Sequence, residues 1–231
     1  MNIKHAMVLA AGIGKRMQPL TFKTPKPLLE INNISLIERA INLLIDNGVQ
    51  EISINVHYLS EQIESFLNKK EFKVNIVISS EDSLLDTGGG VLKATENFGK
   101  NPFFVINPDT VWGKNYSAEV KTLESNYYKN NKPVLLLVNK KLSIDTSFNG
   151  DFNLKNGIIL KEDENQYIYT GLQVINRSFL LEEKSPIFSM NKIWNRLIKD
   201  KNLQGLESNQ KFYHLNTFNM YKKISSLNLT D

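Results

Sequence analysis

The residues Val8–Pro27 read Val-Leu-Ala-Ala-Gly-Ile-Gly-Lys-Arg-Met-Gln-Pro-Leu-Thr-Phe-Lys-Thr-Pro-Lys-Pro, and they decide the fold class of this chain. A short apolar run, His5–Ala10, comes directly before Gly12 and Gly14, which is the pattern of a buried strand followed by a tight turn. In open α/β sheets, ligands lie beyond the carboxyl ends of the strands, and glycines there let backbone N–H groups approach a phosphate closely. The stretch therefore predicts a phosphate-binding turn after the first strand.

The spacing within this turn excludes two other phosphate-binding motifs. A dinucleotide-binding fingerprint requires a third Gly or Ala where Met17 stands, and a P-loop requires a Gly-Lys-Ser/Thr triplet that this turn lacks. Lys15 and Arg16 follow the glycines and supply cationic donors for a phosphate chain. Further along, prolines on both sides stiffen the backbone around Lys26. We therefore expect a second, rigid loop that presents a lysine to the phosphates.

The first half of the chain alternates strand-like and helix-like segments. Apolar residues recur with a helical period over Ser35–Asn47, while Glu51–Val56 alternates as a strand does. Further strands are predicted at Val74–Ile78 and Phe103–Ile106, and further helices at Ser60–Leu67 and Gly89–Asn97. Strands separated by helices pair in parallel with right-handed crossovers. The pattern predicts an α/β fold with a doubly wound, mostly parallel, Rossmann-like sheet and helices on both faces.

The second half is less regular. The pattern predicts a helix at Ala118–Tyr128, a strand at Val134–Val138, and late helices at Asn191–Lys199 and Phe218–Leu227 that flank a strand at Phe212–Leu215. Short strands separated by turns are predicted at Phe152–Leu154, Ile158–Leu160, Tyr167–Tyr169 and Leu172–Ile175. These short strands indicate a small antiparallel lobe that faces the substrate. No internal repeat or Pro/Ser-rich linker divides the chain, so we expect residues 1–231 to form one domain.

Composition narrows the classes of partner. The chain has no cysteine, which excludes a disulfide framework, a thiolate zinc site and a cysteine nucleophile, and suits a reducing compartment. Its net charge is +4, but the lysines are scattered and balanced by acids, whereas a nucleic-acid binder clusters its charge. No segment approaches the roughly 20 apolar residues that span a bilayer. We expect a cytoplasmic protein without a nucleic-acid or membrane partner, and we infer no obligate protein partner.

A known family shares these motifs. The pattern Leu-Ala-Ala-Gly-x-Gly-x-Arg-Met-x-Pro-Leu-Thr from Leu9, followed by Pro25-Lys26-Pro27-Leu28, resembles the signature of the sugar-1-phosphate nucleotidyltransferases, or sugar-nucleotide pyrophosphorylases. The resemblance implies a reaction of a nucleoside triphosphate with a sugar 1-phosphate, using Mg²⁺. The subgroup it resembles most is the short N-acetylmuramate-1-phosphate uridylyltransferase type. It implies a nucleotide-binding half at about residues 1–110 and a sugar-binding half at about residues 111–231.

The resemblance also implies roles for single residues. Nucleotide-binding roles fall on the glycine turn, at Leu9, Ala10, Ala11, Gly12, Gly14 and Lys15. Arg16 would neutralise the leaving pyrophosphate, and Lys26 would hold the α-phosphate and the incoming sugar phosphate. Asp109, in Asn107-Pro108-Asp109, stands where the family has the aspartate of a Gly-Asp or Ala-Asp pair that holds Mg²⁺. A carboxylate at the end of a strand suits this hard cation.

Two further stations resemble the family downstream. The segment Ser80–Gly90 is similar to the base-recognising segment, which implies nucleotide contacts at Glu81, Thr87, Gly88 and Gly89. We expect a glycine-rich turn there that allows close backbone approach to the base, followed by a helix start with positive potential. Gly150-Asp151-Phe152 and Thr170-Gly171-Leu172 resemble the sugar contacts. Asp151 would accept sugar hydroxyls, and Gly171 would leave room for the ring.

One station departs from the family. Its second metal-binding aspartate lies in a motif like Trp-Val-Asp-Val-Gly-Thr, whereas this chain has Phe-Tyr-His-Leu-Asn-Thr at 212–217, so that His214 replaces the aspartate. Imidazole is a poor Mg²⁺ ligand and suits softer metals. His214 could bind Mg²⁺ through a water or contact a phosphate; it could hold Mn²⁺ directly; or the metal site could be weakened. The expected cofactor is thus Mg²⁺, with Mn²⁺ as the alternative.

The sequence leaves several functions open. The form of the Asp-Thr-Gly-Gly-Gly segment and the short length favour uridylyl transfer to an amino-sugar phosphate. Together with the subgroup resemblance, this implies UTP and N-acetylmuramate 1-phosphate as the substrates. The alternatives are a mannose-1-phosphate guanylyltransferase, a glucose-1-phosphate thymidylyl- or uridylyltransferase and, in another class, a non-catalytic nucleotide-binding module. The two remaining histidines are expected to be structural at His57, after a strand, and superficial at His5.

Overall fold

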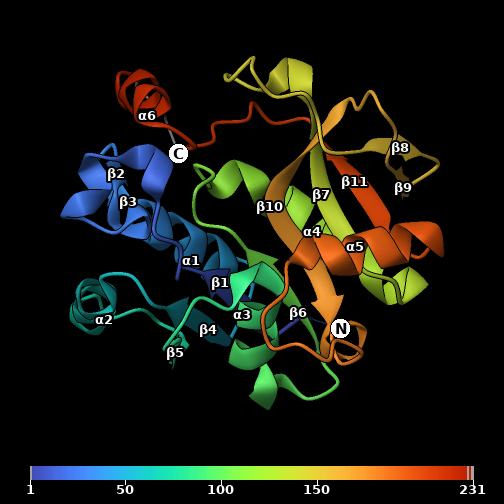
Figure 1. The fold of residues 1–231 in the computed structure, drawn as a ribbon, viewed down its shortest axis with the longest axis horizontal. Coiled ribbons are helices and arrows are strands. Elements are labelled where there is room, and N and C mark those ends of the chain that lie inside the picture. The colour runs from blue at the N-terminus through green and yellow to red at the C-terminus, as the bar shows by residue number, and fades with distance from the viewer. Residues whose placement is uncertain (1, 228, 230–231) are drawn as a thin grey trace.

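The fold is organised around one nine-stranded sheet. The computed structural model describes residues 2–227 and 229, and its strands run in the order β5-β4-β1-β6-β10-β7-β11-β9-β8 (Figure 1). Their bounds are His5–Leu9 (β1), Glu51–Val56 (β4), Asn75–Ser80 (β5), Pro102–Ile106 (β6), Val134–Asn139 (β7), Asn153–Lys155 (β8), Ile158–Leu160 (β9), Tyr167–Asn176 (β10) and Gln204–Ser208 (β11). A separate ribbon pairs β2 (Glu30–Ile31) with β3 (Ile34–Ser35).

The four strands predicted in the first half pair in parallel, as expected. Val8 of β1 lies opposite Ile54 of β4 on one side and Ile106 of β6 on the other, and β5 continues the sheet beyond β4. Because these strands run in one direction, their carboxyl ends meet at a single edge of the sheet. The segments that follow β1, β4 and β6 therefore converge there, which is where open α/β sheets hold their ligands.

Helices cover both faces of the sheet, which confirms the predicted α/β class. The helices are Leu36–Asp46 (α1), Ser60–Lys69 (α2), Asp86–Ala94 (α3), Ser117–Asn130 (α4), Met190–Lys199 (α5) and Phe218–Ser225 (α6). Buried side chains of α1, α2 and α4 pack in one hydrophobic core with one face of the sheet, and those of α3 and α5 pack in a second core with the other face. Figure 1 shows α3 and α5 in front of the strands.

Local sequence explains where α1 begins and ends. The Ser35 hydroxyl accepts a hydrogen bond from the Glu38 amide at 3.3 Å, which satisfies one free donor of the first turn. The apolar positions of the helical period are buried, among them Ile37 and Ile41. The helix ends before Gly48, whose φ of +86° suits glycine.

The second half contains the antiparallel strands that were predicted, but they belong to the central sheet. The two short strands predicted at 167–169 and 172–175 are one long strand, β10, which lies between β6 and β7 and runs antiparallel to both. A register shift between Tyr169 and Gln173, at Gly171 with its φ of +96°, gave the appearance of a turn in the sequence. The small strands β8 and β9 join the same sheet through β11. The sheet is thus mixed: the parallel strands of the first half are joined to antiparallel neighbours in the second.

The strand predicted at 212–215 is wrong. That segment makes only isolated bridges, from Phe212 to Ser143 and from His214 to Thr110. The true strand is β11, which pairs in parallel with β7. Its Gly205 lowered its strand signal, but a Cβ at this position would lie within 3.0 Å of three neighbouring side chains, so close packing explains the glycine.

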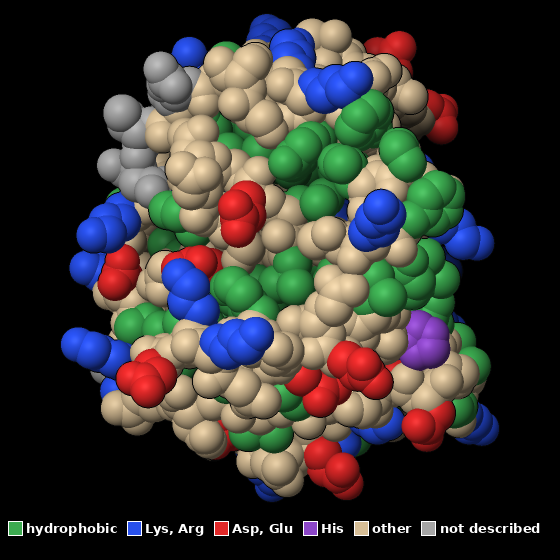
Figure 2. Space-filling model, turned by 90° about the vertical axis from the view of Figure 1, so that its left-hand side faces the viewer, with side chains coloured by type: hydrophobic (Ala, Val, Ile, Leu, Met, Phe, Trp, Pro, Cys, Tyr) green, Lys and Arg blue, Asp and Glu red, His purple; other side chains and the backbone are tan. Residues whose placement is uncertain are grey.

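The surface agrees with the scattered charge of the sequence. On the face drawn in Figure 2, basic and acidic side chains are interspersed, with hydrophobic side chains gathered between them. Among residues 2–227 and 229, no helix is long and apolar enough to cross a membrane.

Candidate active site

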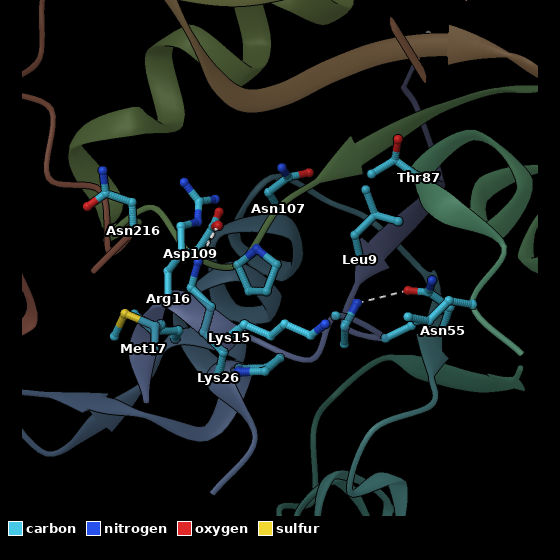
Figure 3. A pocket seen from close by; sticks show the side chains of 18 of the residues that line it. Leu9, Lys15, Arg16, Met17, Lys26, Asn55, Thr87, Asn107, Asp109 and Asn216 are labelled. Carbon is cyan, nitrogen blue, oxygen red and sulfur yellow. Dashed lines mark hydrogen bonds and ion pairs between the residues drawn. The ribbon is translucent and has the colours of Figure 1, made fainter. Parts of the chain in front are cut away.

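A cavity of about 590 Å³ opens at the carboxyl edge of β1, β4 and β6. Most of the residues predicted to bind nucleotide or to act in catalysis line it, namely Leu9, Ala10, Ala11, Gly12, Gly14, Lys15, Arg16, Lys26, Glu81, Thr87 and Asp109. Figure 3 shows Arg16, Lys26 and Asp109 together on one side of the cavity, with Leu9, Asn55 and Thr87 on the other. Gly88, Gly89, Asp151, Gly171 and His214 lie outside the lining.

The glycine turn is shaped by its backbone. Gly14 has a φ of +69°, and a Cβ there would lie 3.0 Å from a methyl carbon of Thr21. The Gly14 carbonyl accepts bonds from the Met17 amide at 2.8 Å and the Thr21 hydroxyl at 2.9 Å, which close the turn. By contrast, a Cβ on Gly12 would meet nothing within 4 Å. Gly12 therefore leaves open space for a ligand, whereas Gly14 is required by the turn itself.

Lys26 and Asp109 form an ion pair on one side of the cavity. Lys26 Nζ donates to Asp109 Oδ2 at 2.6 Å, and the two side chains are 16% and 22% exposed. Burial alone would raise the pKa of Asp109, but the charges of Lys26 and His214 and the lysine hydrogen bond lower it to about 2. The carboxylate is therefore ionised at any physiological pH. Its second oxygen, Oδ1, is buried and has no hydrogen-bond partner among the described residues.

His214 lies beside this pair. Its Nε2 lies 3.7 Å from Asp109 Oδ2. Burial lowers the pKa of His214, and the Asp109 carboxylate opposes this shift, while the cations Lys26 and Arg16 add to it. The imidazole is consequently neutral at pH 7. Where the family motif has a negatively charged aspartate, this chain therefore has an uncharged side chain beside Asp109.

A second polar network involves a residue that the sequence reading missed. Asn55, at the end of β4, accepts a hydrogen bond from the Ala10 amide at 2.8 Å and donates to Glu81 Oε1 at 2.7 Å. Glu81 Oε2 accepts from the Leu85 amide at 3.0 Å. The buried Glu81 carboxylate is therefore fixed, and each of its oxygens retains a free lone pair. The position of Asn55 at the carboxyl end of a predicted strand was the available signal.

The glycines of the predicted base-recognising segment lie in a helix and not in a turn. They lie inside the first turns of α3, which begins at Asp86 and not at residue 89. The amides of Gly88 and Gly89 donate to the Phe188 carbonyl at 2.8 and 3.0 Å. A Cβ on Gly88 would lie 2.4 Å from the Phe188 ring. These glycines make room for the chain around Phe188, and their amides are already paired.

The two predicted sugar contacts belong to the region where β10 meets the end of β6. Asp151 Oδ2 accepts a hydrogen bond from the Tyr169 amide at 2.9 Å. The Gly171 carbonyl accepts from the Asn107 amide at 2.8 Å, and a Cβ on Gly171 would lie 2.9 Å from Asn107 Cβ. Both residues therefore shape the backbone beside the cavity, and their contact with a sugar stays a prediction.

Three further residues, Asn216, His57 and His5, can now be compared with what the sequence predicted for them. Asn216 lines the cavity, and its Nδ2 donates to the buried Asp145 carboxylate at 2.7 Å, a contact the sequence did not indicate. His57 accepts or donates a hydrogen bond at Nδ1 with the Glu81 carbonyl at 2.8 Å, which agrees with the structural role expected for it. His5 is half-buried and its ring lies 4.8 Å from that of Phe98, so it is less superficial than expected.

This arrangement of sheet, glycine turn and lysine–aspartate pair is that of an enzyme that handles nucleotides. Residues 5–142 match the Nucleotidyl transferase family, and the chain belongs to that family. It is a sugar-1-phosphate nucleotidyltransferase.

Individual relatives are consistent with this assignment. The chain is 31% identical over 221 residues to the N-acetylmuramate alpha-1-phosphate uridylyltransferase of Caulobacter vibrioides. This alignment covers 92% of this chain and 91% of that protein. The protein of the same name from Neisseria meningitidis is 41% identical over 52% of this chain and 53% of its own length. The mannose-1-phosphate guanyltransferase of Hypocrea jecorina is 39% identical over 46% of this chain and 30% of its own length.

Solved structures support the fold. The apo form of a UDP-glucose pyrophosphorylase superposes with a TM-score of 0.79 at 18% identity, over 96% of this chain and 97% of that one. The inositol-1-phosphate CTP transferase from T. maritima superposes with a TM-score of 0.77 at 17% identity, over 98% of each chain. At such low identity the likeness concerns the fold alone.

Enzymes of this family typically use a divalent metal, and one residue here fits such an ion. Asp109 offers a buried oxygen without a hydrogen-bond partner, which is the kind of atom that a hard cation uses. Among residues 2–227 and 229, no group of three or more His, Cys, Asp or Glu side chains is placed to hold a metal. A metal held here would therefore take most of its ligands from substrate phosphates and water, as Mg²⁺ commonly does.

Proposed function

We propose that this enzyme transfers a uridylyl group from UTP to N-acetylmuramate 1-phosphate and releases pyrophosphate. The observation that carries the proposal is the extent of the match to the Caulobacter vibrioides uridylyltransferase, which spans 92% of this chain and so includes both predicted halves. The guanyltransferase of Hypocrea jecorina matches only 46% of the chain. Because the match spans both the predicted nucleotide-binding half and the predicted sugar-binding half, it supports the proposed sugar as well as the proposed nucleotide.

The Glu81 carboxylate supports the choice of base. The two Glu81 oxygens accept hydrogen bonds from Asn55 and the Leu85 amide and offer further lone pairs, so the part of a base that meets them must carry an N–H group. Uracil, thymine and guanine carry a ring N–H at the centre of their pairing edge. Cytosine and adenine present a bare ring nitrogen there, and their only N–H donors on that edge belong to the exocyclic amine at its side, so the discrimination requires the carboxylate to meet the ring position. Because Asn55 and the Leu85 amide hold Glu81 in place, the carboxylate cannot turn away from a mismatched base. This geometry favours UTP over CTP and ATP.

The chemistry requires positioning and charge neutralisation more than covalent help. An oxygen of the sugar phosphate attacks the α-phosphorus, the bond from that phosphorus to the bridging oxygen breaks, and pyrophosphate leaves with the electron pair. The attacking phosphate is already anionic, so no general base is needed. Lys26 holds the α-phosphate and the incoming phosphate, and Arg16 neutralises the leaving group. Asp109 would hold the divalent metal, which supplies further neutralisation of phosphate charge.

A matrix of four nucleoside triphosphates against several sugar 1-phosphates tests the substrates. Pyrophosphate release would be measured with Mg²⁺ and with Mn²⁺, and each sugar nucleotide identified by mass. We expect the highest kcat/KM for UTP with N-acetylmuramate 1-phosphate. A kcat/KM about tenfold higher for GTP with mannose 1-phosphate, or for a thymidylyl or uridylyl transfer to glucose 1-phosphate, would contradict the proposal. A thermal shift with UTP but no pyrophosphate release from any pair would indicate a nucleotide-binding module instead.

A further inference from the structure

His214 is fastened beside Asp109 by its backbone. The Leu215 amide donates to the Asp109 carbonyl at 2.8 Å, and the Val111 amide donates to the Tyr213 carbonyl at 2.9 Å. Between these two bonds, His214 lies opposite Thr110 in an antiparallel bridge. The segment is thus joined directly to the chain that leaves β6. This pairing holds the backbone of His214 beside that of Asp109.

The neighbouring threonine fixes the tautomer of the imidazole. Thr110 Oγ1 has one proton, and it donates that proton to the Thr170 carbonyl at 2.6 Å. Toward His214 Nδ1, which lies 3.5 Å away, the same oxygen presents a lone pair. The proton of the neutral ring therefore lies on Nδ1, and Nε2 carries the lone pair. An N–H bonded to a second group is also what orients metal-binding histidines in other proteins.

Aromatic rings hold the imidazole plane. The Phe212 ring is stacked on it, with centroids 5.6 Å apart and an angle of 16° between the planes. Phe148 contacts it edge-on, with centroids 5.9 Å apart. With its plane and its tautomer both set, His214 directs a bare nitrogen toward Asp109 Oδ2, 3.7 Å away.

Two lone-pair donors facing each other in a buried place repel unless a cation lies between or beside them. Lys26 supplies one cation, but it occupies Asp109 Oδ2 and leaves the buried Oδ1 without a partner. Lysine must also turn toward phosphate in the proposed reaction, which frees the carboxylate. The remaining donors are then one carboxylate and one imidazole nitrogen. Mg²⁺ favours an all-oxygen shell, whereas imidazole suits first-row transition ions.

We propose that Asp109 and His214 Nε2 form a mixed oxygen–nitrogen cation site, completed by triphosphate oxygens, that selects a first-row transition ion such as Mn²⁺ over Mg²⁺. This inference rests on the proposed function only in that a nucleoside triphosphate binds beside the site. It gives the histidine a direct ligand role. The sequence also left open that His214 binds the metal through a water or that the metal site is weakened. The test below separates these two outcomes from direct ligation.

Electron paramagnetic resonance with Mn²⁺ as the probe tests the site without turnover. The full chain would be mixed with Mn²⁺ and UTP, and the pulsed spectrum examined for coupling of the metal to an imidazole nitrogen. We expect this coupling in the wild type and its loss in His214→Asp, which offers only oxygen. Mn²⁺ bound to the wild type without nitrogen coupling would overturn the proposal. This result in the wild type does not depend on whether any variant folds.

Competition between the two ions gives a second measurement. Mg²⁺ would be added to the Mn²⁺ complex, and the released Mn²⁺ read from its free signal. We expect His214→Asp to lower the preference for Mn²⁺ over Mg²⁺ by about tenfold, because the ligand set becomes all oxygen. An unchanged preference in a folded variant would contradict the site. Nitrogen coupling in an enzyme inactive toward every sugar 1-phosphate would retain the cation site and reject only the proposed function.

Discussion

The two sides of the cavity are built in different ways. On the β1 side, backbone conformation makes the site, because Gly14 requires a φ of +69° and Gly12 leaves open space. On the side of β6 and β10, the site consists of side chains from distant segments, with Asp109 paired to Lys26 and faced by His214. A site made by backbone can be recognised from the spacing of glycines and prolines. A site made by side chains depends on which segments the sheet brings together.

Removing the lysine that joins the two sides should have the largest effect. We expect Lys26→Ala to reduce kcat by about 100- to 1000-fold, because a charged donor to the reacting phosphates is lost. Steady-state release of pyrophosphate measures it. Lys23→Ala is the matched control, since that exposed lysine lies outside the cavity lining and should leave kcat unchanged. A kcat for Lys26→Ala within about threefold of the wild type would remove Lys26 from the reaction.

Base discrimination should respond next. We expect Glu81→Gln to lower the preference for UTP over CTP by about 10- to 100-fold, because an amide can donate to the bare ring nitrogen of cytosine, whereas a carboxylate cannot. The ratio of kcat/KM for the two triphosphates measures this. Asp82→Asn removes an exposed carboxylate next along the chain and should leave the ratio unchanged. An unaltered ratio in Glu81→Gln would show that the base does not contact this residue.

Alanine substitutions at two glycines should have different effects, because Gly88 is packed against protein and Gly12 faces open space. We expect Gly88→Ala to lower the free energy of unfolding by about 1–2 kcal/mol despite the better helix propensity of alanine, because the new Cβ would lie 2.4 Å from the Phe188 ring. Gly12→Ala should keep its stability and instead raise the KM for UTP, since its Cβ would point into open space. Urea unfolding and steady-state kinetics measure both variants. Equal stability losses in the two would contradict this distinction.

The smallest predicted effect concerns acid stability. The folded pKa of Asp109, about 2, lies below its ordinary value of 3.8, so its contribution to stability is present above about pH 4 and is lost as the pH falls toward 2. We expect the wild type to lose about 1 kcal/mol more than Asp109→Asn between about pH 6 and pH 3. Urea unfolding at the two pH values measures it. Parallel losses in the two proteins would mean that the ion pair does not stabilise the fold.

Much of the β1 side could be predicted because its residues encode backbone geometry. Gly12, Gly14 and the prolines around Lys26 impose local conformations whatever surrounds them. The parallel pairing of the first strands followed from their alternation with helices, and the structure confirms it. On the other side, Asp109 could be predicted because the segment Asn107-Pro108-Asp109 follows a buried strand and resembles the family's metal-binding station.

The other side could not be predicted in the same way. The strand β10 lies between β6 and β7. Its own residues do not determine which strands it pairs with, so this topology could not be predicted. Phe188 accepts hydrogen bonds from the amides of Gly88 and Gly89 although it lies far from them in the sequence, so no local pattern marks this contact. The strand β11 was missed because Gly205 interrupts its apolar pattern, although that glycine is required by neighbours that arrive from other strands. His214 was noticed, but its tautomer depends on Thr110, which only the fold places beside it.

The reverse reaction tests the proposed substrates most directly. UDP-N-acetylmuramate and pyrophosphate would be incubated with the enzyme and Mg²⁺ or Mn²⁺, and the nucleoside triphosphate formed would be measured beside a parallel reaction of GDP-mannose. If both sides of the cavity act as proposed, UTP forms from UDP-N-acetylmuramate at least about tenfold faster than GTP forms from GDP-mannose. Formation of GTP at an equal or higher rate would contradict the assignment of the base and the sugar.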